Sequence, residues 1–291
     1  MKKIRKYIYL LLIFSYVSFT SCEDFALGEK FLQKPPSGDV TIDTIFSTAE
    51  YARRGLWYAY SKLPYGFSTG YNNSTSMRVG SIESLTDLAQ SYVGYAGADK
   101  LYYPGLYNAG SEDESGGEDH ATKYNMYARD PWKGIRHAWV FINNVDRVPD
   151  MTAEEKLRLK AEAKITIAVQ YSEMLRHYGA LPIVDHAIMP EEMGLPERAT
   201  LQQTVDFITR LLDEAIACKE LPWALPEDDL SNESGRMTGA AAMGLKLRVL
   251  LFVASPLFNS DEPYFPGEAS DKLMTWFGGD SEQRWKDAAK A

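Results

Sequence analysis

Residues 152–182 read TAEEKLRLKAEAKITIAVQYSEMLRHYGALP and hold the most regular pattern in the chain. Thr152 and Glu155 have the spacing of a capping box at a helix start. Gly179 and Pro182 are a typical helix end. Between them, apolar side chains recur every three or four residues, the repeat of one helix face: Leu157, Ala161, Ile165, Ala168, Tyr171, Leu175 and Tyr178. The stretch therefore predicts one long helix.

The same signals on both sides of this stretch predict four more helices. They are expected after Ser47 up to Pro64, from Pro131 to Pro149, from Thr200 to Ile216 and from Met237 to Ala254. The last is rich in Gly and Ala, which let a partner backbone approach closely, so we expect it to be central and buried. No stretch alternates apolar and polar residues for long, so strands are a minor component. The predicted fold is mostly all-α, with paired helices whose uneven spacing makes any tetratricopeptide-like repeat degenerate.

Composition and motifs exclude several classes of protein. The 291 residues are 45% hydrophobic and 24% charged, with a formal charge of −9, which argues against a nucleic-acid binder. The chain has four histidines and two cysteines, and it lacks the Gly-x-Ser-x-Gly, His-Glu-x-x-His, P-loop and Gly-x-Gly-x-x-Gly motifs. Acidic runs at 112–114, 118–119 and 227–229 could bind calcium but lack EF-hand spacing, which favours solvated loops. We therefore expect no metal and no cofactor, whereas the many carboxylates leave a glycosidase pair open.

The first residues have the pattern of a secretory signal peptide. Four basic side chains between Lys2 and Lys6 precede the apolar run 7–17, which is shorter than the roughly 20 residues of a membrane span. Small residues then lead to Cys22, the arrangement of a bacterial lipobox, in which the thiol is acylated after cleavage. The alternative is a plain secreted protein with a cysteine near the cut. Removing residues 1–21 takes away four basic residues and no acidic one, which leaves 27 against 40, or −13.

Tyrosine is enriched in one segment with weak helical signal. Residues 92–127 contain seven of the 18 tyrosines in the chain. An exposed tyrosine offers a rigid apolar face and a hydroxyl, which suits stacking on sugar rings or gripping peptides. The alternative, that these side chains only pack a long loop onto the helices, is open for each residue taken singly.

Several segments together resemble the SusD/RagB family of outer-membrane nutrient-binding lipoproteins of Bacteroidetes. The matching segments are Cys22–Asp24, Phe31–Asp39, Trp132–Arg136 with Asn143 and Asn144, Ala161–Lys164 with Tyr171, Arg176–Pro182, and Gly235–Ala242 continuing through Leu250 and Leu251 to Pro256. The resemblance covers nearly all of residues 22–291.

This resemblance implies a non-catalytic protein held in the outer membrane by a lipid on Cys22 and facing the exterior. Its partners would be a SusC-type TonB-dependent transporter and an oligosaccharide or polysaccharide, with peptides as an alternative ligand. The family's ligand-binding loops correspond to the tyrosine-rich segment. Ligand contacts are therefore expected at Tyr102, Tyr103, Tyr107 and Asn108.

The resemblance also predicts how the chain is divided into segments. We expect a signal peptide at residues 1–21, a lipidated and irregular tether at 22–46, and a SusD-like helical domain at 47–291. The family is about twice as long, and residues 281–291 read as a helix without a stop signal, so we expect this domain to be incomplete. A surface glycoside hydrolase with a carboxylate pair in its loops is the alternative from a different class.

Overall fold

The structure is a computed structural model that describes residues 41–63, 87, 88, 90, 103–106, 126–189, 192, 194 and 196–291. For residues 126–130 it describes the backbone only. Residues 42–291 form one compact unit. The fold below is that of this unit.

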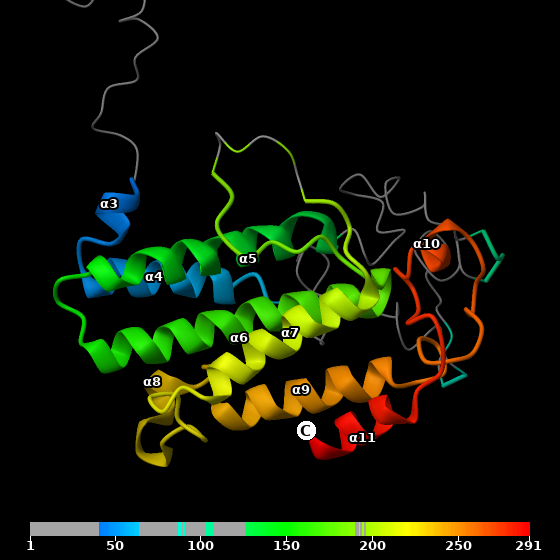
Figure 1. The fold of residues 1–291 in the computed structure, drawn as a ribbon. Coiled ribbons are helices and arrows are strands. Elements are labelled where there is room, and N and C mark those ends of the chain that lie inside the picture. The colour runs from blue at the N-terminus through cyan, green and yellow to red at the C-terminus, as the bar shows by residue number, and fades with distance from the viewer. Residues whose placement is uncertain are drawn as a thin grey trace, which may run out of the picture. The chain divides into compact units, whose positions relative to one another are not determined.

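Helices make up the regular structure of the described residues (Figure 1). Pro182 and Arg198 form an isolated β-bridge, and no strand occurs in the ranges that the structure describes. The α-helices and the two 3-10 helices, η4 and η5, have the following bounds: α3 (Ile42–Ile45), α4 (Ala49–Tyr60), α5 (Met126–Asn144), η4 (Val145–Arg147), α6 (Ala153–Tyr178), α7 (Leu201–Ile216), η5 (Glu227–Asp229), α8 (Leu230–Glu233), α9 (Gly239–Val253), α10 (Glu268–Asp271) and α11 (Glu282–Lys290).

The long helix α6 begins and ends where its sequence predicts. The Thr152 side chain accepts a hydrogen bond from the Glu155 N–H at 3.2 Å. Gly179 follows the helix with φ 72°, and a Cβ at this position would lie 2.7 Å from the Met274 carbonyl oxygen. Both the positive φ and the close approach require glycine here. The Ala180 N–H donates to the same Met274 oxygen at 2.8 Å, which attaches the end of α6 to the C-terminal segment.

The helices pack as an array in which the larger ones contact their neighbours along the chain (Figure 1). α5 packs on α4 and on α6, α6 packs on α7, and α9 packs on α7 and on α11. Because α6 has neighbours on several sides, 13 of its 26 residues are buried. The prediction of a mostly all-α fold with packed helices is confirmed.

Tyr171 lies at the centre of the core. Its ring makes edge contacts with Trp132 on α5 and with Phe207 on α7, at centroid distances of 5.9 and 4.8 Å. Its hydroxyl donates to the Pro182 carbonyl and accepts from the Val184 N–H, at 2.9 and 2.8 Å. A fully buried hydroxyl is tolerated because both bonds are made. This residue therefore joins three helices to the loop after α6.

A buried ionic cluster joins α4, α6 and the segment before α9. Glu162 on α6 is inaccessible to solvent and accepts hydrogen bonds from the Tyr60 hydroxyl at 2.8 Å and from Arg158 at 3.0 Å. Arg236 donates to both oxygens of Glu162, at 2.6 and 3.2 Å. Glu233 accepts from both arginines. We call Tyr60, Arg158, Glu162, Glu233 and Arg236 the Glu162 cluster.

Three local predictions differ from the structure. α5 begins at Met126 instead of Pro131, because a proline in the second turn removes only one hydrogen bond near the helix start. The N-cap of α4 is Thr48 instead of Ser47, which places Tyr51 at the third helical position, so no capping box forms. Residues 42–45, within the stretch expected to be an irregular tether, form α3.

The prediction that residues 237–254 form a central, buried helix is wrong for one side of α9. Only four of its 15 residues are buried, and Leu247 and Leu251, one turn apart, are 43% and 51% exposed. α6, α7 and α11 contact α9 and leave this side of it exposed. α11 is held by the same packing, with Ala288 buried.

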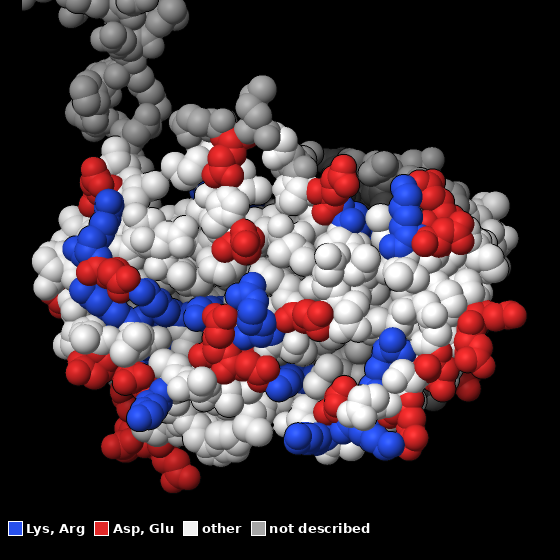
Figure 2. Space-filling model, viewed as in Figure 1, with Lys and Arg blue, Asp and Glu red and all other residues white. Residues whose placement is uncertain are grey.

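Charges of both signs are interspersed on the surface. Figure 2 shows Lys and Arg lying among Asp and Glu on the face drawn there. In the described part of the chain, no helix is both long enough and apolar enough to span a bilayer. The same residues contain no group of three or more His, Cys, Asp or Glu side chains able to hold a metal ion.

Candidate functional site

Most residues expected at the functional site lie outside the described residues. This applies to Cys22, Tyr102, Tyr107 and Asn108. Tyr103 is described and lies in a turn that includes Gly105, where φ is 71°. Its side chain is 45% exposed. The assignment of Tyr103 as a ligand contact stays a prediction.

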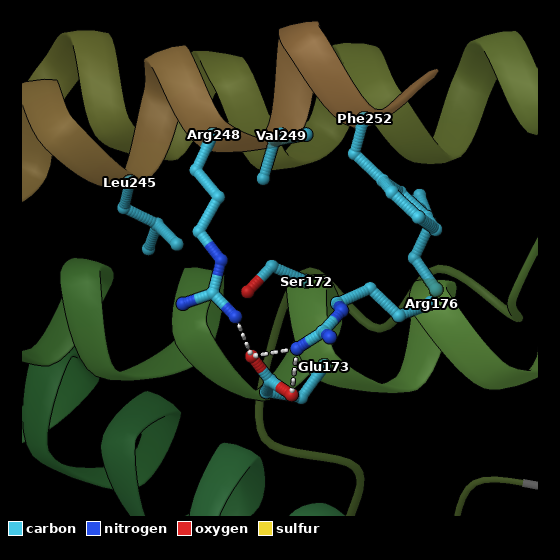
Figure 3. A pocket seen from close by; sticks show the side chains of 8 residues that line it. Ser172, Glu173, Arg176, Leu245, Arg248, Val249 and Phe252 are labelled. Atoms are coloured by element: carbon cyan, nitrogen blue, oxygen red, sulfur yellow. Dashed lines mark hydrogen bonds and ion pairs between the residues drawn. The ribbon is translucent and has the colours of Figure 1, made fainter. Parts of the chain in front are cut away.

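A pocket of about 130 Å³ lies between α6 and α9 (Figure 3). Each helix contributes one face to it, because the lining residues recur three or four positions apart along each helix. α6 supplies Ser172, Glu173, Leu175 and Arg176, and α9 supplies Leu245, Arg248, Val249 and Phe252. Half of these side chains are apolar, and three of the other four are charged.

Glu173 is the acceptor for two guanidinium groups that reach it from different helices (Figure 3). Arg176, three residues further along α6, approaches both carboxylate oxygens through Nη1, at 3.2 and 3.0 Å. Arg248 crosses from α9 and donates through Nη2 to Oε1 at 3.3 Å. The carboxylate side chain is only 12% exposed, whereas Arg176 and Arg248 are 39% and 59% exposed.

The charges in this pocket do not cancel. Two guanidinium groups carry two positive charges, and Glu173 carries one negative charge. One positive charge therefore remains beside an apolar wall, in a chain whose formal charge is −9. Charge-assisted hydrogen bonds to a carboxylate are the strong interaction that such a pair of arginines offers.

Ser172 is the remaining polar group of the pocket. It is buried, and its hydroxyl donates to the Val169 carbonyl oxygen at 2.8 Å. Because its hydrogen is used in this bond, Oγ can act toward a ligand only as an acceptor. The pocket lining contains neither a histidine nor a second carboxylate. It can therefore bind and orient a ligand, but it lacks the carboxylate pair of a glycosidase.

Sequence reasoning did not find this pocket. Arg176 appeared in it only within the segment Arg176–Pro182 of the family resemblance, and Arg248 was not singled out. A basic residue inside an apolar helix is a usable signal, since it needs an anionic partner or solvent. The pairing of α6 with α9 is not readable from spacing, because more than 70 residues separate Glu173 from Arg248.

Solved structures with the same fold are found at low sequence identity. One is BT4246, with 23% identity and a TM-score of 0.54 over 82% of this chain. Another is a SusD-like carbohydrate-binding protein, BF0978, from Bacteroides fragilis, with 18% identity and a TM-score of 0.53 over 72%. A third is surface glycan-binding protein A from Bacteroides uniformis, with 17% identity and a TM-score of 0.53 over 72%.

The chain is much shorter than these similar proteins. The matched part covers 38% of BT4246, 38% of BF0978 and 43% of the Bacteroides uniformis protein. No protein-family model matches the chain, and a search of curated proteins also finds no match. The structural similarity extends over most of this chain and agrees with the observed helical array. This chain therefore has the SusD-like fold.

Proposed function

We propose that this protein is a non-catalytic, cell-surface glycan-binding lipoprotein that delivers its ligand to a SusC-type TonB-dependent transporter. One observation carries the proposal: the fold is shared with proteins described as SusD-like carbohydrate-binding and surface glycan-binding proteins. A fold alone does not specify a ligand, so the sequence must supply the second support. That support is the tyrosine-rich segment and the lipobox-like start of the chain.

The proposed ligand contacts are Tyr102, Tyr103, Tyr107 and Asn108. Tyrosine rings bury the apolar face of a sugar and use the hydroxyl for a hydrogen bond, and asparagine donates to and accepts from sugar hydroxyls. Replacement of Tyr103 by alanine is expected to weaken glycan binding about tenfold, the usual effect of removing an aromatic anchor. Tyr264 is a suitable control position, because its side chain is 81% exposed and outside this segment.

Affinity electrophoresis of the full chain against a panel of polysaccharides tests the ligand class. Retardation by at least one polysaccharide, reduced by Tyr103→Ala but not by Tyr264→Ala, supports the proposal. A folded protein that binds no polysaccharide contradicts it. Binding to peptides alone, measured by isothermal titration, would indicate that the protein binds peptides instead of glycans. Release of shortened sugars that is lost on replacing one loop carboxylate would instead identify a glycoside hydrolase.

Membrane attachment is proposed to occur through a lipid on Cys22, after removal of residues 1–21 and with residues 22–46 as the tether. A mature chain with a formal charge of −13 is repelled by anionic lipid head groups, so attachment would depend on the acyl chains. Cys22→Ser should therefore move the protein from the membrane fraction to the soluble fraction. Unchanged fractionation would disprove the anchor. Co-purification of a TonB-dependent transporter with the wild-type protein from native membranes tests the proposed partner.

A further inference from the structure

We propose that the pocket between α6 and α9 binds the carboxylate of a uronic-acid residue, so that the protein prefers acidic glycans to neutral ones. This inference rests on the proposed glycan binding but concerns residues other than those of the tyrosine-rich segment. The residues that carry it are Glu173, Arg176 and Arg248, with the apolar side chains beside them.

The arrangement of the two arginines leaves Arg248 available for a ligand. Arg176 approaches both oxygens of Glu173, whereas the contact of Arg248 uses one nitrogen at the longer distance of 3.3 Å. Arg248 is also the more exposed of the two, at 59% against 39%. A guanidinium group has five N–H donors in a planar fork, so the others can take a ligand carboxylate. Such a carboxylate would neutralise the one positive charge of Arg176 and Arg248 that Glu173 does not compensate.

The size and walls of the pocket suit one sugar residue. Its volume of about 130 Å³ is well below the roughly 300–1,000 Å³ of pockets that enclose a whole drug-sized ligand. Leu245 and Phe252 supply an apolar surface for the C–H face of a sugar ring. Ser172 Oγ and the Glu173 carboxylate are acceptors for the hydroxyl groups of the same ring. The pocket thus offers guanidinium donors for a carboxylate and acceptors for hydroxyl groups.

The same walls are poorly suited to an acidic peptide. Both walls are helices whose central N–H and C=O groups are already bonded within the helix. The amides of a bound peptide backbone would find few partners there, and an unsatisfied buried amide is costly. A pyranuronate ring has no amide groups; its hydroxyl groups can donate to the two acceptors, and its carboxylate can accept from Arg248. This difference favours a glycan as the source of the carboxylate.

Isothermal titration of the full chain with a trimer of galacturonic acid and with its methyl ester tests the inference. The ester has the same rings without the charges. We expect the acid form to bind about tenfold more tightly, the usual effect of one charge-assisted hydrogen-bonded pair. Arg248→Gln should reduce this ratio to about one. Arg54→Gln is the matched control, because Arg54 is an exposed arginine on α4 that pairs with Glu50 outside the pocket.

The possible outcomes separate this inference from the proposed function. A preference for the acid form that survives in Arg54→Gln and disappears in Arg248→Gln supports the inference. Equal binding of acid and ester by the wild-type protein, or a preference retained in Arg248→Gln, overturns it while glycan binding stands. Competition by a glutamate pentapeptide as effective as the acid trimer overturns the assignment to a glycan. A chain that binds neither the trimers nor any neutral polysaccharide refutes the proposed function and this inference together.

Discussion

Replacement of Glu162 by glutamine is expected to destabilise the protein substantially, although the two side chains have nearly the same shape. Glu162 is inaccessible to solvent and is the common acceptor of the Glu162 cluster. In the native protein its charge and that of Glu233 balance the charges of Arg158 and Arg236. The variant keeps both arginines, with side chains 22% and 15% exposed, and leaves only Glu233 to compensate them.

The expected loss in the free energy of unfolding is about 3 kcal/mol, at the lower end of the range for breaking a buried ion pair. The lower end applies because Glu233 still neutralises one of the two positive charges. For a chain of this size, such a loss lowers the melting temperature by roughly 6–12 °C. It should appear as a lower midpoint of urea unfolding with an unchanged slope, measured by circular dichroism.

Glu214→Gln is the matched control for this measurement. Glu214 also lies between two cations, Lys164 and Arg210, but its side chain is 39% exposed. Solvent screens such pairs, so the expected loss is about 0.5 kcal/mol. Losses that are equal in the two variants would refute the argument from burial. A Glu162→Gln protein as stable as the wild type would show that the cluster contributes nothing net to the fold.

The remaining predictions concern backbone strain and titration. Gly179→Ala should lower the free energy of unfolding by about 2 kcal/mol or more, because the new Cβ would clash with the Met274 carbonyl oxygen and alanine would be strained at φ 72°. An unchanged midpoint of urea unfolding would contradict this. Burial raises the pKa of Tyr60 well above its usual value near 10. Above pH 10 unfolding therefore releases a proton, and the free energy of unfolding falls as the pH rises. Tyr60→Phe should make this fall shallower in urea titrations at a series of pH values. The protonated ring of His186 donates hydrogen bonds to the carboxylates of Glu192 and Asp185, and these bonds, that to Glu192 first, raise the pKa of His186 above 6.5. NMR titration should show that a neutral amide variant of either acid lowers this pKa, and an unchanged pKa would disprove the pairing.

Much of the helical array could be predicted from local sequence. The starts of α6 and α7 depend on Thr152 and Thr200, whose side chains cap the first turn, and the spacing of apolar residues predicts which faces are buried. The predictions were wrong where one local sequence signal is compatible with more than one structure. Pro131 is compatible with a helix start and with an early interior position, and the small residues of α9 allow close packing without specifying how many sides are covered.

The candidate pocket depends on contacts that no local pattern contains. Local sequence determines that Arg176 and Glu173 share one face of α6, because they are three residues apart on a helix. Only the tertiary structure decides that Arg248 of α9 reaches the Glu173 carboxylate, and that Arg236 forms an ion pair with Glu162. Helix capping and periodicity act over a few residues, whereas these ion pairs span more than 70 residues and form only when burial of the apolar faces brings the helices together.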